Sequence, residues 1–332
     1  MAQAFFGGVH PNDMKAATNE KAIEQLSPPP AQVVIPMSMH FGAPCTPIVS
    51  VGDYVKVGQK IGEFKGLGAP IHASVSGKVV AIEPRPYSMG GNMTSVVIEN
   101  DYQNTVSEEV KAPADPNALT TEEMIEIVKN AGIVGMGGAT FPTHVKISGG
   151  IGQVTTVIIN GAECEPYITS DTRTMLDRSD ELMEGARLVQ HFLQVLRVIF
   201  AIEDNKPRCI QLYRKLTKDE DGMEVCALKS LYPQGGEKVL IYNTIGEIVP
   251  EGKLPLDVGA IVLNCTTLAN IARYCKTGMP LVEKCITVDG SAVAKPKNVI
   301  VPIGMKLADV FEQSGGFCAE PKKVLYLSLI HI

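Results

Sequence analysis

GIVGMGGATFPTHVK, residues 132–146, and NGAECEP, residues 160–166, are the two stretches of this chain that indicate both a fold and a site. The first contains closely spaced glycines, whose missing side chains let backbone N–H groups approach a phosphate: Gly135, Gly137 and Gly138. Lys146 adds a positive charge. The second follows an apolar, β-branched run, and polar residues at the carboxyl end of a parallel strand usually contact ligands. Together they predict an anion-binding site made by two loops.

Glycine-rich loops also serve as plain turns, and the spacing here is not the Gly-x-Gly-x-x-Gly pattern of dinucleotide-binding proteins. The glycines alone therefore do not decide between a turn and a ligand site. The Phe-Pro-Thr that follows them, together with residues 160–166, favours the ligand site.

The composition is that of an ordinary globular protein. A hydrophobic share of 45% and a formal net charge of −6 give no basic excess that would indicate nucleic-acid binding. The N-terminal residues lack the charged-then-apolar pattern of a secretion signal. The longest apolar stretch, Leu188–Ile202, is interrupted by polar residues and cannot span a bilayer, which needs about 20 mainly apolar residues.

Eight cysteines are scattered along the 332 residues, and no two stand at Cys-x-x-Cys spacing. Without a secretion signal, reduced intracellular thiols are expected. The even spacing of Cys265, Cys275 and Cys285 raises the hypothesis of a metal site, but structural metal sites favour close ligand pairs. We therefore expect no metal site in this chain.

Changes of composition along the chain predict several domains. An N-terminal arm and a proline-rich linker are expected over residues 1–32. Short β-branched runs between glycine turns predict a barrel-sandwich domain over residues 33–106. After a charged, proline-bearing connector, alternating strand and helix patterns predict an α/β domain over residues 117–255. A linker and a small β-grasp domain are expected over residues 256–320.

The α/β region begins with a helix-start signal, because Thr120 is followed three residues later by Glu123. Strand and helix patterns then alternate, which predicts a parallel sheet. The expected elements are a strand at Val154–Ile159, a helix at Asp177–Leu193, a strand at Val198–Glu203, a helix at Pro207–Leu216 and a strand at Glu224–Leu228. In the long helix, Met183 and Leu188 are expected in the core.

A third module is predicted beyond Pro280. The run Cys285–Val293 predicts a hairpin with Asp289-Gly290 at its turn. A β-branched run from Val299 and a helix at Leu307–Gln313 follow. This order of elements resembles a β-grasp domain of the soluble-ligand-binding type.

The barrel-sandwich pattern resembles biotinyl and lipoyl carrier domains, which present a modified lysine at a hairpin tip. Lys65 stands near the corresponding place, but its neighbours lack the Met-Lys-Met or Asp-Lys-Ala context of carrier lysines. A plain surface lysine is the favoured interpretation. A carrier or docking protein without redox activity stays an alternative.

Three further phrases complete a family pattern: GGVHP at residues 7–11, YPQGGEK at 232–238 and NCTTLAN at 264–270. With the first two stretches, they make the chain resemble the C subunit of Rnf-type membrane electron-transport complexes over nearly its whole length. It also resembles the flavin-binding subunit of respiratory complex I. The resemblance implies an FMN-binding subunit that reacts with NAD(H), in a complex that couples ferredoxin:NAD⁺ oxidoreduction to Na⁺ or H⁺ translocation. The alternative is a soluble Rnf-C-like flavoprotein that serves a cobalamin or amino-acid reductase.

The resemblance implies roles for the residues of the first two stretches. Gly135, Gly137 and Gly138 are expected to admit the FMN phosphate or ribityl chain. Lys146 is expected to pair with that polar tail or with the flavin edge. The Asn160 amide both donates and accepts hydrogen bonds, which suits the flavin ring.

The acids are expected to orient ligands rather than to react. Glu163 and Glu165 would position ribose or nicotinamide groups, because hydride transfer between nicotinamide and flavin needs stacked rings and little acid–base help. Phe141 would flank that stack or fill the core. We therefore expect no catalytic side chain.

The later family phrases supply the remaining expected cofactor contacts: Gly235, Gly236, Glu237, Asn264 and Thr267. Relatives in complex I carry an acid at the place of Ala162 and a second acid near Glu237, so the nucleotide contacts are expected to differ from theirs. Capping of the following helix is the alternative role for Thr267.

Rnf C subunits continue into a module with two Cys-x-x-Cys-x-x-Cys-x-x-x-Cys-Pro motifs, which suit two [4Fe-4S] clusters. The chain contains neither motif and ends in the hexapeptide Leu327–Ile332, which a common transposase sequencing adapter encodes in one frame. We therefore expect residues 327–332 to be an artefactual tail on a truncated fragment. The two clusters would belong to the full-length protein.

The expected location is the cytoplasmic face of the inner membrane, as a peripheral protein. Other membrane and peripheral subunits of the Rnf complex would hold it there, because the chain has no predicted membrane segment. Electrons from ferredoxin would arrive through those partner subunits. No nucleic-acid partner is expected.

Overall fold

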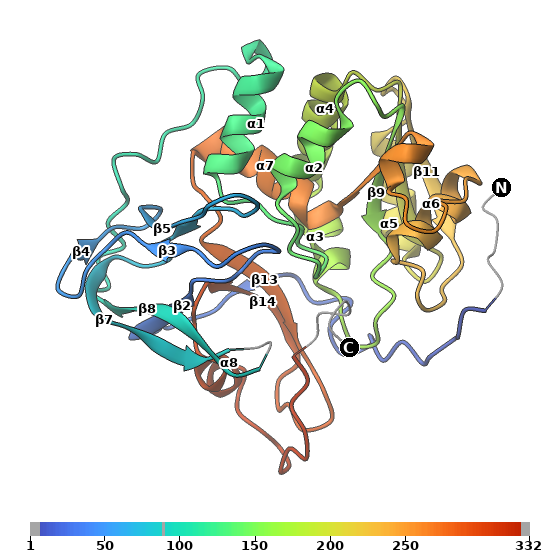
Figure 1. Cartoon of the computed structure of the whole chain (residues 1–332). Coiled ribbons are helices and arrows are strands. Elements are labelled where there is room, and N and C mark those ends of the chain that lie inside the picture. Colours follow the sequence, from blue (N-terminus) through green and yellow to red (C-terminus); the bar gives the residue numbers. More distant parts are fainter. Residues whose placement is uncertain (1–6, 88–89, 327–332) are drawn as a thin grey trace. The chain divides into compact units, whose positions relative to one another are not determined.

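The computed structural model describes residues 7–87 and 90–326, so the artefactual tail expected at Leu327–Ile332 lies outside the described residues. The chain divides into two compact units, each made of segments that are far apart in the sequence (Figure 1). Unit 1 comprises residues 7–22, 115–125 and 145–272. Unit 2 comprises residues 23–87, 90–114, 126–144 and 273–326.

Unit 1 is built on a four-stranded parallel sheet in the order β11-β10-β9-β12. The strands are β9 (Thr156–Gly161), β10 (Arg197–Glu203), β11 (Met223–Leu228) and β12 (Ala260–Asn264). Their Val- and Ile-rich runs are almost wholly buried, as expected of parallel strands covered on both faces. The predicted parallel α/β class is confirmed.

Helices follow the strands of unit 1: α3 (Ser170–Asp177), α4 (Ser179–Leu193), α5 (Pro207–Leu216), α6 (Glu237–Ile245) and α7 (Cys265–Thr277). The helices η1 (Pro116–Ala118), α1 (Thr121–Asn130) and α2 (Thr143–Gly150) precede β9 in the chain, and the short helix η2 (Pro255–Val258) lies between α6 and β12. The Thr120 hydroxyl accepts from the Glu123 N–H, and the Glu123 carboxylate accepts from the Thr120 N–H. The predicted start of α1 is therefore a capping box.

Two predicted boundaries in unit 1 were wrong by two residues. The strand expected at Val154–Ile159 is β9, Thr156–Gly161, so Asn160 lies within the strand rather than after it. The helix expected from Asp177 begins at Ser179, because Arg178 (φ −126°, ψ 33°) has a non-helical backbone that separates α3 from α4. The helix predicted at Pro207–Leu216 is confirmed as α5.

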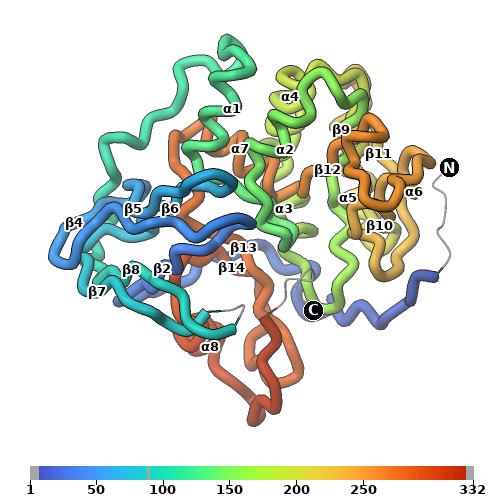
Figure 2. Tube along the Cα trace, in the orientation of Figure 1, coloured from blue at the N-terminus to red at the C-terminus, as the bar shows by residue number. Residues whose placement is uncertain are grey.

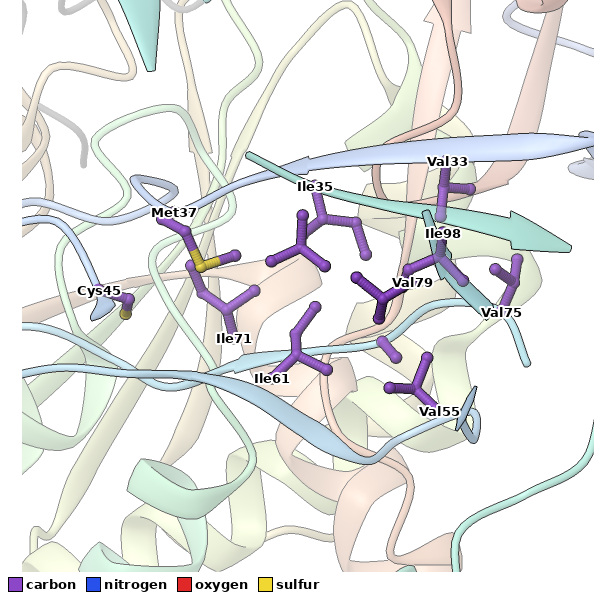
Figure 3. Close-up of a cluster of buried hydrophobic side chains, with 12 residues drawn as sticks. Val33, Ile35, Met37, Cys45, Val55, Ile61, Ile71, Val75, Val79 and Ile98 are labelled. Carbon is purple, nitrogen blue, oxygen red and sulfur yellow. The ribbon is translucent and has the colours of Figure 1, made fainter. Parts of the chain in front are cut away.

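The first part of unit 2 is a barrel-sandwich of two antiparallel sheets. One has the order β2-β8-β7-β4 and the other the order β3-β5-β6. The strands are β2 (Gln32–Pro36), β3 (Thr46–Pro47), β4 (Tyr54–Val55), β5 (Lys60–Glu63), β6 (Ile71–His72), β7 (Gly77–Pro86) and β8 (Asn92–Asn100). Alternate residues of β2, Val33 and Ile35, enter a buried cluster with Ile61, Val79 and Ile98 (Figure 3).

The second part of unit 2 is a small sheet in the order β1-β14-β13, with helix α8 (Leu307–Gln313) after it. Strand β13 (Glu283–Val288) pairs antiparallel with β14 (Lys297–Pro302), and β1 (Glu24–Gln25) pairs parallel with β14. The first strand of the predicted hairpin is confirmed, but its tight Asp289-Gly290 turn and its second strand before Val293 were wrong. The strands stay paired only to Val288 and Lys297, and Val293 in the long connection pairs with Phe317 instead.

Candidate functional site

The carboxyl ends of β9 and β12 place two asparagines side by side. Asn160 and Asn264 are partners in the register of the parallel pair. The Asn160 amide nitrogen donates to the Gly235 carbonyl at 3.0 Å, and its oxygen accepts from the Ala162 N–H at 3.1 Å. Asn160 therefore ties the end of β9 to the loop that leads into α6, and the sheet edge and that loop form one surface.

Asn264 organises the helix that follows β12. Its amide nitrogen donates to the Asp171 carboxylate at 2.7 Å, and its oxygen accepts from the Thr267 N–H at 3.2 Å. The capping group at the start of α7 is therefore Asn264, and Thr267 is a buried residue of the first turn. The Asp171 carboxylate also accepts from the Thr266 hydroxyl at 2.6 Å.

Glu163 has its carboxylate inside the fold. One oxygen accepts from the Asp171 N–H at 2.6 Å, and the other accepts from the Thr172 N–H and hydroxyl at 3.2 and 2.7 Å. These are N–H groups of the first turn of α3, which has no side-chain cap of its own. Burial raises the pKa of Glu163, and the nearby ammonium of Lys15 opposes that rise. The Glu163 carboxylate therefore stabilises the start of α3.

Glu165 is the more available acid of the NGAECEP stretch. Its side chain is half-buried, and burial raises its pKa to about 7, with Glu163 and Asp171 adding negative charge nearby. Between the two acids, the Cys164 sulfur accepts from the Gly235 N–H at 3.3 Å. Burial raises the pKa of Cys164 to about 12, so this thiol stays protonated at neutral pH.

The YPQGGEK phrase leads into α6, with Gly236 as the residue before the helix. The first N–H groups of a helix have no partner within it, so this end attracts anions. Lys146, on α2, forms an ion pair with Glu237 in the first turn of α6, and both side chains are partly exposed. The ion pair places one cation beside this helix start.

The glycine-rich stretch forms a tight loop in unit 2. The Gly135 N–H donates to the Phe141 carbonyl at 2.9 Å, and the Thr140 N–H donates to the Gly135 carbonyl at 3.2 Å. The Phe141 ring lies 5.8 Å from the ring of Phe41, which comes from the barrel-sandwich and has its own N–H bonded to the Thr140 carbonyl. Gly137 is exposed, and Gly138 has a φ of +111°. The loop is therefore closed by backbone bonds and flanked by two aromatic rings.

The structure places the predicted residues in two groups. Unit 1 holds Lys146, Asn160, Glu163, Glu165, Gly235, Gly236, Glu237, Asn264 and Thr267, whereas unit 2 holds Gly135, Gly137, Gly138 and Phe141. Within unit 1, the contacts above connect the strand ends to both loops. Asp171, Phe41 and the buried Lys15 were missed, because nothing local in the sequence distinguishes them from ordinary surface residues.

Across residues 7–87 and 90–326, no group of three or more His, Cys, Asp or Glu side chains is arranged to hold a metal ion. Over the same residues, no helix has both the length and the apolar character needed to cross a membrane.

Comparison with family models identifies three segments. Residues 128–273 match the Nuo51 FMN-binding domain, residues 3–103 match the RnfC barrel sandwich hybrid domain, and residues 285–324 match the SLBB domain. The first match contains both the glycine-rich stretch, residues 132–146, and the NGAECEP stretch, residues 160–166. The predicted combination of a barrel-sandwich, an FMN-type α/β domain and a β-grasp domain is therefore confirmed.

Relatives of known name match nearly the whole chain. It is 42% identical to the C subunit of the Na⁺-translocating ferredoxin:NAD⁺ oxidoreductase complex of Acetobacterium woodii, over 97% of this chain and 73% of that protein. It is 42% identical to the proton-translocating counterpart of Clostridium ljungdahlii, over 98% of this chain and 71% of that one. The C subunit of the ion-translocating oxidoreductase complex of Salmonella arizonae is 36% identical, and the chain spans 48% of its length.

A solved structure resembles the chain in fold. An NAD⁺-reducing [NiFe]-hydrogenase in its H₂-reduced state superimposes with a TM-score of 0.51 and 21% identity, over 60% of this chain and 40% of that one. At that identity, the likeness concerns the fold alone.

Proposed function

Because the chain belongs to the family of C subunits of ion-translocating ferredoxin:NAD⁺ oxidoreductase (Rnf) complexes, we propose that it binds FMN and that NAD(H) reacts there. The family makes it a subunit of a membrane-associated, multi-subunit oxidoreductase. The observation that carries the proposal is the edge of the unit 1 sheet, where the in-register asparagines Asn160 and Asn264 meet the Gly235-Gly236 loop. In open α/β sheets, ligands bind outside the carboxyl ends of the strands.

The residues at this edge fit FMN. The Asn160 amide has two N–H donors, and one of them donates to the Gly235 carbonyl. The second can donate to a carbonyl oxygen or a nitrogen of the flavin ring. The start of α6 and the Lys146 ammonium supply positive potential for an anionic group. FMN, when bound, supplies the hydride and single-electron chemistry, and the protein contributes binding, orientation and electrostatics.

Within unit 1, the residues divide these tasks. Asn160 would orient the ring, Lys146 would pair with the polar tail or the flavin edge, and Glu165 would orient the nicotinamide nucleotide. Asn264 and Glu163 support them through Asp171 and the start of α3. Gly135, Gly137, Gly138 and Phe141 stay predicted contacts, from unit 2, for the FMN tail or the stacked rings.

We propose further that the complex holds this chain at the cytoplasmic face of the membrane through partner subunits. Iron–sulfur clusters of the complex would exchange electrons with its flavin. The names of the relatives, which pair ferredoxin with NAD⁺, support electron exchange between ferredoxin and NAD(H) in the complex.

Reconstitution tests the function directly. Purified protein incubated with FMN is expected to retain flavin absorbance that NADH bleaches. Lys146→Ala is expected to weaken FMN affinity about tenfold, the size of a charge-assisted hydrogen bond, because the cation is lost and Glu237 is left unpaired. The matched control is Lys253→Ala, which removes a cation paired with Asp257 in an exposed loop and is expected to change nothing. A wild-type protein that binds no FMN would contradict the proposal.

A further inference from the structure

The N-terminal arm, residues 7–22, is part of unit 1 although more than a hundred residues separate it from the sheet (traced in blue in Figure 2). Val9 and Tyr232 exchange two backbone hydrogen bonds of 2.9 and 2.7 Å. Further along the arm, the Thr18 hydroxyl accepts from the Thr169 hydroxyl at 2.8 Å. The arm therefore contacts the YPQGGEK phrase and Thr169, the residue before α3 that closely follows the NGAECEP stretch.

Lys15 is a buried charged residue of this arm. Its side chain is 6% exposed, and its ammonium donates to the carbonyls of Glu163, at 2.9 Å, and Ile168. The same nitrogen lies 3.9 Å from the Glu163 carboxylate. One cation thus joins the two ends of the loop that contains Cys164, Glu165 and Pro166, and the mechanism proposed above makes no use of it.

The loop between those carbonyls has an unfavourable backbone. Glu163 has a φ of +48° and Tyr167 a φ of +69°, in the left-handed region that residues with a side chain rarely adopt. Such conformations persist only where the surroundings hold them. The Lys15 ammonium donates to the Glu163 carbonyl and so holds the backbone of Glu163. The Tyr167 N–H donates to the Asp13 carbonyl of the arm at 2.8 Å. The arm therefore fixes both strained residues.

The charged groups near Glu165 also connect Lys15 to this loop. The charges of Glu163, Asp171 and Lys15 act on Glu165, and the buried ammonium of Lys206 donates to the nearby Ala162 carbonyl. The two acids and burial raise the pKa of Glu165, and Lys15 lowers it. Lys15 is itself surrounded by Glu163, Glu165, Glu203 and Lys206, and burial lowers its pKa. Removing Lys15 would therefore raise the pKa of Glu165 further.

We propose that Lys15 is a positioning residue of the nucleotide site: it holds the loop of residues 163–168 in the shape that presents Glu165 to the bound ligand. The inference rests on the proposed function, because it assumes that FMN and NAD(H) bind at this edge of the sheet. Neither the family models nor the names of relatives assign a role to the arm. Lys15 does not touch the reacting atoms and acts through Glu163, Ile168 and Glu165.

The test compares Lys15→Met with the wild-type protein in three measurements. FMN affinity of the apoprotein, by fluorescence quenching, is expected to fall about tenfold, because misplacement of a supporting loop weakens ligand geometry. The pH dependence of flavin reduction by NADH between pH 6 and 9 is expected to keep an inflection from Glu165, moved up by about one unit. Glu165→Gln should abolish that inflection, which assigns it. Amides of residues 163–168 should exchange hydrogen faster.

The double variant Lys15→Met/Glu163→Gln distinguishes the effect of losing the loop's hydrogen-bond donor from the effect of changing the charge near Glu165. It also replaces the single variant in the test if that variant does not fold. It removes one cation and one facing acid, so the inflection should return close to its wild-type pH. The carbonyls of residues 163 and 168 still lack their donor, so weak FMN binding should persist. Arg208→Ala is the matched control, because it removes an exposed cation paired with Glu20 of the same arm and should leave all three measurements unchanged.

The outcomes distinguish the two proposals. A wild-type protein that binds no FMN overturns the proposed function and this inference with it. A wild-type protein that binds FMN, beside a Lys15→Met variant with wild-type affinity and a wild-type inflection, overturns only the role of Lys15. A lowered melting temperature without either change would show that Lys15 stabilises the fold alone, and would also overturn it.

Discussion

Glu165 differs from the other acid of its stretch in what surrounds it. Glu163 receives three hydrogen bonds at the start of α3, whereas Glu165 is half-buried, and the charges of Glu163 and Asp171 raise its pKa while that of Lys15 lowers it. Burial is the main reason that its pKa rises to about 7. An acid with such a pKa binds a proton in the folded protein at a pH where the unfolded chain has already released it.

This difference predicts how stability depends on pH. Between pH 4.5 and about 7 the folded state binds more protons at Glu165 than the unfolded state does, so stability falls as pH rises through that window. The loss is at most about 3 kcal/mol, and less where solvent screens the carboxylate. The melting temperature of Glu165→Gln minus that of the wild type should therefore be larger at pH 8 than at pH 5.

The control for this prediction is Glu251→Gln, which changes an exposed acid in a loop of unit 1. Its melting temperature should follow the wild type at both pH values. If the difference between Glu165→Gln and the wild type were the same at pH 5 and pH 8, the assignment of the shifted group would be wrong.

Helices α4 and α7 approach each other closely at one residue. A Cβ atom added to Gly185 would lie 2.2 Å from the Leu268 carbonyl oxygen, so the two helices would have to separate. In α2, a Cβ added to Gly149 would meet only the end of the Leu256 side chain, at 3.2 Å. Both glycines are helical, and a helix gains about 1 kcal/mol from alanine in place of glycine.

The two alanine substitutions should therefore have opposite consequences. Gly185→Ala is expected to destabilise unit 1 by about 2 kcal/mol, because a backbone oxygen cannot move aside as a side chain can. Gly149→Ala should stay within about 1 kcal/mol of the wild type. Urea unfolding followed by circular dichroism measures both, and equal midpoints for the two variants would contradict the close packing.

At the scale of the whole molecule, unit 2 joins segments from opposite ends of the chain. Val34 of β2 donates its N–H to the Gly304 carbonyl at 2.8 Å, and the Ser74 hydroxyl donates to the Ile303 carbonyl at 2.5 Å. Ile303 also packs against the buried cluster of the barrel-sandwich. The β-grasp part therefore supports the barrel-sandwich core.

Gly304 offers a test of that support. Its φ is +89°, and a Cβ there would lie 2.8 Å from Ile35 Cγ1 and 2.9 Å from the Val34 carbonyl oxygen. Gly304→Ala should therefore loosen β2, and amides of residues 32–36 should exchange hydrogen faster. Gly290→Ala is the control, because Gly290 also has a positive φ but has no atom within 4 Å of its Cβ position. Equal exchange in β2 of both variants would contradict the coupling.

Much of the architecture could be predicted from the sequence. The strands and helices of the α/β region follow from apolar periodicity, and α5 was predicted to the residue. The capping box at Thr120 was predictable because it depends on neighbours in the sequence. The Asp289-Gly290 turn was not, because the length of a hairpin loop depends on where pairing stops, and Val293 pairs elsewhere.

The sequence by itself determined the family and the α/β class, because these depend on local patterns and short phrases. Tertiary structure decided which charges meet. The Glu163 carboxylate is used at the start of α3, Glu165 is left as the available acid, and Lys15 of the N-terminal arm contacts Glu163 and lowers the pKa of Glu165. Long-range contacts and burial set these roles, and neither is encoded in the spacing of neighbouring residues.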